Sequence, residues 1–363
     1  MEQTGALMQA YRSLQTQVEQ YMEKLNPRPN CILADTFLLW TGETAKKFQI
    51  PRIIFDGMNC LTRMCNHVLY FSMVYESVGE SELFVLPGLP DHIELTRSQL
   101  PFAFNPRLKG MSDFNEKLLA SESEAYGIVV NSFEELEQGY VDEYQKVKGD
   151  KVWCIGPLSL CHKDESEKVQ SLALAPESSK RPFIWVVRAG HKIEKIEKWI
   201  DEQGFGERTK DRALLICGWA PQLLVLSHPA VGGFLTHCGW NSNLEGVCAG
   251  VPMVTWPQFQ EQFYNEKLVV QVLRTRVSVV AQKTSGLWVD EDKSGEFVKS
   301  EAFLKAIKMV MEEGKEGKER RKRAKELSKI ANRAMEEGGS SHRNMTRRYQ
   351  EPSKNRKLRL EDR

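Results

Sequence analysis

Residues Trp219–Gln262 read WAPQLLVLSHPAVGGFLTHCGWNSNLEGVCAGVPMVTWPQFQEQ, and this stretch decides the fold of the chain. The apolar run 231–236 predicts a strand that turns abruptly at 237–239 into a helix over 240–249. A second apolar run, 251–256, predicts another strand directly after that helix. A strand, a turn, a helix and a strand in this order are typical of a parallel α/β unit.

The turn at the start of the predicted helix has the features of an anion site. The first N–H groups of a helix have no partners within it and carry a partial positive charge. Gly239 lets the backbone approach a ligand closely, and Asn241 and Ser242 add short polar side chains at the same point. A phosphate group fits this description well.

Length and charge limit the classes of protein that this stretch can belong to. The chain has 363 residues, which exceeds the roughly 250 to 300 at which single cores stop growing, so two domains are expected. Its 50 basic and 49 acidic side chains nearly cancel. Because nucleic acids and anionic membranes bind strongly basic surfaces, the sequence favours a small-molecule ligand instead.

The cysteines indicate a reducing compartment. All eight lie mostly inside apolar runs, and none belongs to a C-x-x-C pair. This distribution predicts reduced thiols in a cytosolic protein and argues against disulfides or a zinc site. No apolar run reaches about 18 residues, and the N-terminus lacks the apolar core of a signal peptide. We therefore expect a soluble cytoplasmic chain without a transmembrane segment.

The first part of the chain has the pattern of an α/β domain, expected over 1–160. A helix is predicted over 7–25, and strands are predicted at 31–34, 51–55, 127–131 and 152–157. Asp35 follows the first strand, where open α/β sheets present functional groups to a ligand. Asp35 could equally cap a helix predicted over 36–48. The proline-rich stretch 85–101 is expected to be a loop with little regular structure.

The second part of the chain is expected to form a separate domain. The polar, irregular segment 161–182 predicts a linker. Strands at 183–188 and 213–217, the stretch quoted above and helices near the C-terminus predict a domain over 183–342. The tail 343–363 shows no apolar periodicity and is expected to be disordered.

One short motif suggests a metal but is set aside. Asp290, Glu291 and Asp292 match the D-x-D pattern with which some sugar transferases hold a divalent cation, yet they lie in a polar loop with no buried strand before it. We therefore expect no metal site and no cofactor.

The stretch Trp219–Gln262 also resembles a known protein family. Across its whole length it resembles the C-terminal signature box of plant family 1 UDP-dependent glycosyltransferases. The segments CILADTFLLWTGETAKKFQIPRIIF (31–55) and GLPDHIELTRSQLP (88–101) resemble the acceptor-side domain of these enzymes, especially the branch that glucosylates triterpenoids and flavonoids. The resemblance implies a GT-B fold, in which two Rossmann-like domains face each other across a cleft, here with an incomplete N-terminal domain.

The resemblance also assigns residues to the nucleoside of UDP-glucose. Trp219 would stack on uracil, and the backbone of Ala220 would hydrogen-bond the edge of the base. Gln222 and Glu245 would bind the ribose, since a carboxylate can accept from two vicinal hydroxyls.

The diphosphate and the sugar are assigned in the same way. The resemblance places the diphosphate at the start of the helix, held by His237, Gly239, the Trp240 backbone, Asn241 and Ser242. Glu261 and Gln262 would contact the sugar hydroxyls, and the terminal Gln favours glucose. Asn243 stands where the family usually has Thr, which we interpret as a change tolerated at the surface.

The implied reaction is direct displacement at the anomeric carbon with inversion and without a metal. A histidine would take the proton from the acceptor hydroxyl, and an aspartate at the position of Asp35 would orient that histidine. None of the seven histidines matches the family's base, so we expect this chain to be truncated relative to the family.

Three hypotheses follow. The first is a UDP-glucosyltransferase that acts on a small lipophilic acceptor of the triterpenoid or flavonoid type. The second is a truncated, non-catalytic remnant that only binds a UDP-sugar. The third is a sugar-nucleotide-binding module of another α/β type. The acceptor itself and the oligomeric state are not predicted by the sequence.

Overall fold

The structure is a computed structural model that describes residues 2–104, 111–161, 174–187, 198, 200–202, 204–279 and 300–346. The chain forms two compact units, and each is described by itself. Unit 1 comprises Met1–Leu158 together with the chain from Ala331 onward, and unit 2 comprises Ser159–Ile330.

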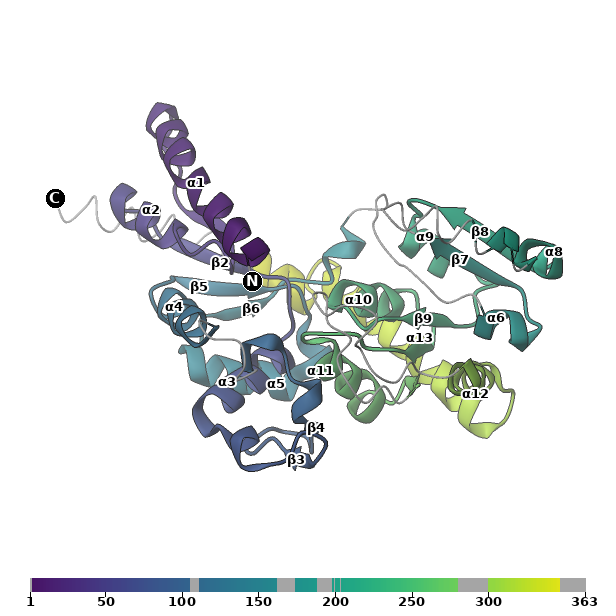
Figure 1. Cartoon of the computed structure of the whole chain (residues 1–363). Helices are drawn as coiled ribbons and strands as arrows, with labels where there is room; N and C mark the ends of the chain where they lie inside the picture. The colour runs from purple at the N-terminus through teal and green to yellow at the C-terminus, as the bar shows by residue number, and fades with distance from the viewer. Residues whose placement is uncertain are drawn as a thin grey trace. The chain divides into compact units, whose positions relative to one another are not determined.

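A four-stranded parallel sheet forms the centre of unit 1. Its strands have the order β1-β2-β5-β6 (Figure 1). They are β1 (Ile32–Asp35), β2 (Arg52–Asp56), β5 (Gly127–Val130) and β6 (Val152–Cys154). Apolar side chains such as Ile54, Ile128 and Val130 are buried, as expected for short parallel strands covered by helices. Because all four strands run the same way, their carboxyl ends lie at one edge of the sheet.

The helices of unit 1 alternate with these strands. They are α1 (Glu2–Lys24), α2 (Thr41–Phe48), α3 (Cys60–Ser72), α4 (Met111–Ser123) and α5 (Glu134–Lys148). The helix predicted over 36–48 begins only at Thr41, because the residues after Asp35 form a turn closed by a hydrogen bond from Leu38 N to Asp35 O. Asp35 is therefore not the cap of α2.

Residues 85–101 contain more regular structure than their prolines predict. Strand β3 (Leu83–Val85) pairs antiparallel with β4 (Glu94–Thr96), and a 3₁₀ turn (Arg97–Gln99) follows. Phe84 and Leu95 face each other in this hairpin and are buried. The expectation of an irregular loop was wrong because the alternation of apolar residues is too short to show a strand.

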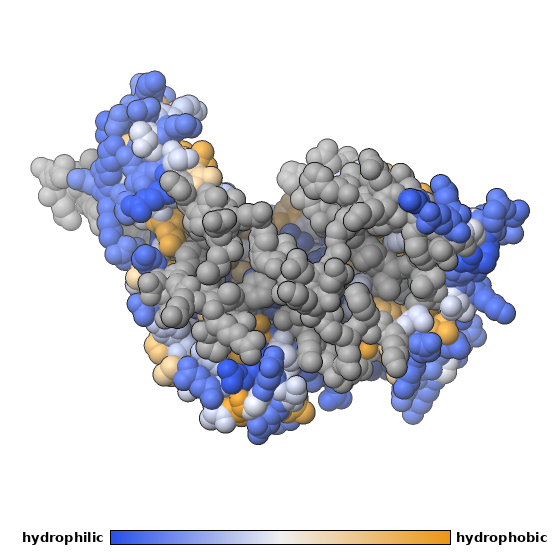
Figure 2. Space-filling model, viewed as in Figure 1, coloured by the Kyte–Doolittle hydropathy of each residue, from blue (hydrophilic) through white to orange (hydrophobic). Residues whose placement is uncertain are grey.

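Helix α1 contacts α2 through polar side chains. Lys47 of α2 forms ion pairs with Glu19 and Glu23 of α1, and Thr44 donates a hydrogen bond to Glu19. The surface of α1 is largely hydrophilic (Figure 2). Among the helices of the described residues, none is both long enough and apolar enough to cross a membrane.

Unit 2 contains two parallel sheets. Strands β9 (Phe234–Thr236), β10 (Met253–Thr255) and β11 (Arg276–Ser278) have the order β11-β10-β9. Strands β7 (Phe183–Val187) and β8 (Ala213–Cys217) form a second, two-stranded sheet (Figure 1). Both strands predicted around the central helix exist, but each is shorter than its apolar run.

The helices of unit 2 include the one predicted after the turn. They are α6 (Leu174–Ser179), α8 (Phe205–Thr209), α9 (Gln222–Leu226), α10 (Trp240–Cys248), α11 (Gln262–Lys267), α12 (Ser300–Met311) and α13 (Lys315–Met335). A π-helical segment (Leu268–Val272) continues α11. Phe303 and Val310 of α12 pack with Val254 and Val277 of the sheet in one buried cluster.

The end of the described chain belongs to unit 1. Residues 340–346 are helical, and Ser341 Oγ donates a hydrogen bond of 2.6 Å to the carbonyl of Gly156. Asn344 Nδ2 donates bonds of 2.9 Å to the Cys154 carbonyl and to Glu134 Oε1. The expectation of disorder from residue 343 was therefore wrong for 343–346, and the remainder of that tail lies outside the described residues. Unit 2 also has other bounds than the domain predicted over 183–342, since it comprises Ser159–Ile330.

Candidate functional site

The turn between β9 and α10 is held by side chains from three elements. Cys238 has a φ of 67°, which residues with a side chain seldom adopt. Its N–H donates to Thr236 Oγ1 over 3.2 Å. Its carbonyl accepts from Asn243 Nδ2 of α10 at 3.3 Å and from Asn265 Nδ2 of α11 at 3.0 Å. These bonds hold the strained conformation at the point where the sequence predicts an anion site.

Gly239 lets the imidazole of His237 lie close to the backbone. Gly239 is the N-cap of α10, and a Cβ atom there would lie 2.5 Å from His237 Nε2. Only glycine can therefore occupy this position without displacing the imidazole. The structure thus brings His237 and Gly239 together at the start of α10, whose first residues include the exposed Asn241 and the buried Ser242.

Three further predicted residues meet beside the start of α10. Gln222 Nε2, from the first turn of α9, donates a hydrogen bond of 2.6 Å to Glu245 Oε2 and one of 3.3 Å to Ser242 Oγ. Burial raises the pKa of Glu245, and the hydrogen bond from Gln222 opposes that rise. Polar groups of α9 and α10 therefore form one cluster, as binding of a vicinal diol would require.

Trp219 presents an aromatic surface just before α9. Its side chain is 45% exposed, whereas the adjacent Ala220 is buried. Gly218, with a φ of 105°, redirects the chain between the end of β8 and this indole. A large exposed aromatic residue on a short connection is available for stacking, which is the contact predicted for uracil.

Gln262 holds the loop between β10 and α11. Its Oε1 accepts from the N–H groups of Gln258 at 2.8 Å and Phe259 at 3.2 Å, and the residue is buried. Glu261 is the N-cap of α11. The structure therefore gives Gln262 a definite role in the loop, and its predicted contact with the sugar stays a prediction.

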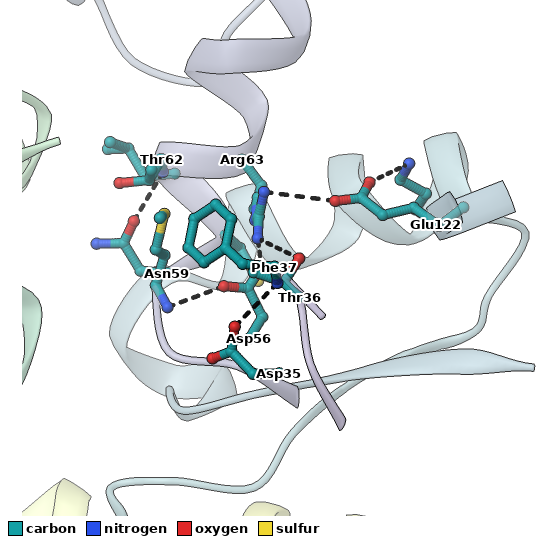
Figure 3. Close-up of polar contacts among 12 residues, drawn as sticks. Asp35, Thr36, Phe37, Asp56, Asn59, Thr62, Arg63 and Glu122 are labelled. Atoms are coloured by element: carbon teal, nitrogen blue, oxygen red, sulfur yellow. Dashed lines mark hydrogen bonds and ion pairs between the residues drawn. The ribbon is translucent and has the colours of Figure 1, made fainter. Parts of the chain in front are cut away.

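Asp35 lies at the carboxyl end of β1 in unit 1. Its side chain is exposed, and Oδ1 accepts a hydrogen bond of 2.9 Å from Phe37 N (Figure 3). Among the described residues of unit 1, no hydrogen bond reaches the other carboxylate oxygen, and no histidine forms an ion pair with Asp35. His67 packs against Phe71, and His92 lies 3.1 Å from Glu94. Asp35 thus has one fixed oxygen and one accessible oxygen.

A buried charge network lies beside Asp35, and the sequence did not predict it. Arg63 of α3 forms ion pairs with Asp56, at the end of β2, and with Glu122 of α4, and Arg63 Nη2 donates a bond of 3.1 Å to Thr36 Oγ1 (Figure 3). Burial alone would lower the pKa of Arg63, but Asp56 and Glu122 raise it by more. The net pKa is therefore above its usual value, and Arg63 stays protonated. The network holds Thr36, and hence the turn that positions Asp35.

Glu137 is a second buried carboxylate that the sequence did not mark. It accepts from the N–H groups of Cys60 at 3.1 Å and Leu61 at 2.8 Å in the first turn of α3, and from Ser132 Oγ at 2.5 Å. Burial raises the pKa of Glu137 to about 7, although these hydrogen bonds lower it. An acidic residue inside a predicted amphipathic helix gives no signal of this role, because the backbone groups that it binds lie 76 and 77 positions away.

Asn243 lies next to the predicted site residues, in an environment that the sequence did not predict. It was expected at the surface, but it is 1% exposed and binds both the Cys238 carbonyl and Arg276 Nη1, the latter at 3.1 Å. That expectation was wrong because sequence alone did not reveal the residues packed around the turn.

Metal ligands do not gather in the described part of the chain, where no group of three or more His, Cys, Asp or Glu side chains could hold an ion. The D-x-D motif at 290–292 lies outside the described residues. All eight cysteines are free thiols.

The fold is α/β, and the polar residues Gln222, Ser242 and Glu245 cluster beside the start of α10 in unit 2. The family described as "UDP-glucoronosyl and UDP-glucosyl transferase" matches residues 127–292. UDP-glycosyltransferase 73C6 of Arabidopsis thaliana is 40% identical over 95% of this chain and 78% of its own length. UDP-glycosyltransferase 73C25 of Barbarea vulgaris is 41% identical with the same coverage.

Solved structures agree with these relatives. The crystal structure of Glycyrrhiza uralensis UGT73P12 complexed with glycyrrhetinic acid 3-O-monoglucuronide has a TM-score of 0.88 at 32% identity, covering 98% of this chain and 79% of that chain. Phytolacca americana UGT2 complexed with UDP-2fluoro-glucose and pterostilbene has a TM-score of 0.77 at 25% identity, covering 96% and 82%. The chain has the GT-B fold and belongs to the plant family 1 UDP-glycosyltransferases. It is therefore a UDP-dependent transferase.

Proposed function

We propose that this enzyme transfers glucose from UDP-glucose to a hydroxyl of a small lipophilic acceptor of the triterpenoid or flavonoid type. The observation that carries the proposal is the cluster of Gln222, Ser242 and Glu245 at the start of α10, with the exposed Trp219 before α9. This arrangement offers a stacking surface, a diol-binding carboxylate and a helix N-terminus in one unit. The ligand glycyrrhetinic acid 3-O-monoglucuronide of the Glycyrrhiza relative, a triterpenoid glycoside, supports the acceptor class.

In the proposed donor site, uracil stacks on Trp219 and bonds the Ala220 backbone, and the ribose binds Gln222 and Glu245. The diphosphate lies at the start of α10, and Glu261 and Gln262 contact the glucose. Phosphate at a helix N-terminus is stabilised by the helix dipole and by the first N–H groups. The positive end of α10 would also stabilise the charge on UDP as it leaves.

In the proposed mechanism, the acceptor oxygen attacks the anomeric carbon from the face opposite UDP, so the configuration inverts. None of the seven histidines matches the family's base, so a substitute base takes the acceptor proton; the Asp35 carboxylate orients this base and stabilises the positive charge that it gains. The fixed Oδ1 and accessible Oδ2 of Asp35 support this role. We propose that the reaction needs neither a metal nor a cofactor. The eight free thiols support a cytoplasmic location.

The test is transfer of labelled glucose from UDP-glucose to a panel of triterpenoids and flavonols, with NMR of the new linkage. We expect a β-linked product, unchanged by EDTA. Asp35→Ala should lower kcat by about 10²-fold or more, whereas Asp142→Ala, an exposed change on α5, should not. Glucose transfer by Asp35→Ala at the wild-type rate would show that Asp35 has no part in the mechanism. UDP binding without transfer to any acceptor would favour the alternative of a chain that only binds the UDP-sugar.

A further inference from the structure

Arg276 is a buried cation directly beneath the start of α10. It is the first residue of β11 and is only 5% exposed. Nη1 donates to Asn243 Oδ1 over 3.1 Å, and Nη2 lies 3.5 Å from the Asn243 carbonyl. The guanidinium therefore contacts the first turn of the helix whose N-terminus forms the candidate anion site.

Within the described residues, Arg276 has no carboxylate as an electrostatic partner, and its Nε has no hydrogen-bond partner. The carboxylate of Glu266 acts electrostatically on Cys238 in this turn, but its Oε1 already accepts from Thr255 Oγ1 and Ser278 Oγ, each over 2.8 Å. Burial also raises the pKa of Glu266, which favours its neutral form. A buried charge without a counter-charge is costly, and an anionic ligand nearby would offset that cost.

Arg276 also acts on the turn through Asn243. Since Asn243 Oδ1 accepts from Arg276, the amide must direct its Nδ2 toward the Cys238 carbonyl, as observed at 3.3 Å. Asn265 binds the same carbonyl from α11. The chain of contacts from Arg276 through Asn243 to Cys238 thus fixes the strained residue that precedes Gly239.

We propose that Arg276 is a positioning residue of the donor site: it fixes the turn 237–239 through Asn243, and its buried charge favours the diphosphate at the start of α10. This inference rests on the proposed placement of the diphosphate. Both parts of the role act on the diphosphate. Uridine has the same base and ribose as UDP but no phosphate, so its binding should not depend on Arg276.

The test is calorimetric titration of UDP and of uridine into the wild type, Arg276→Gln and Arg276→Lys. Gln keeps a donor for Asn243 but removes the charge, and we expect about tenfold weaker UDP binding with uridine affinity changed by less than about twofold. Lys keeps the charge and should restore most of the UDP affinity. Arg274→Gln is the matched control, because Arg274 is exposed and its charge is screened by water and salt.

Equal losses for UDP and uridine in Arg276→Gln, or no loss for UDP, would overturn the proposal. If Arg276→Gln does not fold, Asn243→Asp decides, because the new carboxylate neutralises the charge of Arg276 and can no longer donate to the Cys238 carbonyl, so both parts of the role are lost. That variant should lose UDP affinity by about tenfold or more, and unchanged UDP affinity would overturn the proposal. A wild type that binds neither ligand would instead contradict the proposed function itself.

Discussion

Gln222 Nε2 lies 2.6 Å from Glu245 Oε2, so the first turn of α9 is joined to the middle of α10 by a hydrogen bond to a carboxylate. A bond to an ionised acceptor is stronger than one between neutral groups and favours the charged form of the acid. The pair therefore holds Glu245 in one orientation before any ligand arrives, and it keeps the carboxylate able to accept from ribose hydroxyls.

The first prediction concerns the pH dependence of this pair. Replacing Gln222 with Ala removes a donor that lowers the pKa of Glu245, so burial should raise that pKa further. Protonated Glu245 has fewer acceptor sites, and uridine binding should therefore weaken as pH falls through the pKa of Glu245. We expect the midpoint of this loss to lie at a higher pH in Gln222→Ala than in the wild type.

Calorimetry with uridine across acidic and neutral pH checks this expectation, because uridine carries no phosphate that titrates in the same range. Leu224→Ala is the control, since Leu224 lies on the same helix with its side chain exposed. An identical midpoint in the wild type and Gln222→Ala would show that Gln222 does not set the ionisation of Glu245.

The second prediction concerns Gly239. An alanine Cβ at this position would lie 2.5 Å from His237 Nε2, so Gly239→Ala should displace the imidazole while φ at −58° remains acceptable. We expect UDP affinity to fall by about tenfold through the loss of a contact to the diphosphate. Gly206→Ala is the matched control in unit 2, because no atom lies within 4 Å of its added Cβ. Equal UDP affinities for the two variants would show that His237 does not contact the diphosphate.

The third prediction concerns stability and pH through Glu137. Its folded-state pKa is raised to about 7 from a usual value of 4.5, so between these values the native chain keeps a proton that the unfolded chain has lost. The contribution of Glu137 to stability is therefore greatest below 4.5, is lost as pH rises toward 7 and stays constant above it.

Urea unfolding at several pH values measures this slope. Glu137→Gln removes the titrating group, so its free energy of unfolding should decline less across the window than that of the wild type. Glu143→Gln is the control, because Glu143 lies on the same helix and pairs with the exposed Lys146. The same pH slope in the wild type and Glu137→Gln would contradict the account of this carboxylate.

The sequence predicts the donor half of the fold well, and the reason is local. The strand, turn and helix at 231–249 lie in one continuous stretch, so apolar runs and short polar residues there mark the elements directly. Glu245 and Gln222 were identified from family resemblance, and the structure then brought them together through the packing of α9 on α10.

The residues that the sequence missed act through contacts between distant segments. Arg63 pairs with Asp56 nearby in sequence but with Glu122 only because the fold brings α3 and α4 together. Asn344 binds the Cys154 carbonyl across 190 positions, and such polar contacts leave no apolar periodicity in the tail. Asn243 and Arg276 likewise meet across 33 positions, which a surface interpretation of Asn243 could not foresee.

The measurement that tests the central claim most directly is calorimetric titration of UDP into the wild type, Trp219→Ala and Glu245→Ala, with the exposed Leu224→Ala as control. The account predicts that the wild type and the control bind equally, and that each site variant loses about 1 to 3 kcal/mol of binding free energy from lost stacking or hydrogen bonding. Unchanged affinity in both site variants would show that UDP does not bind beside α9 and α10.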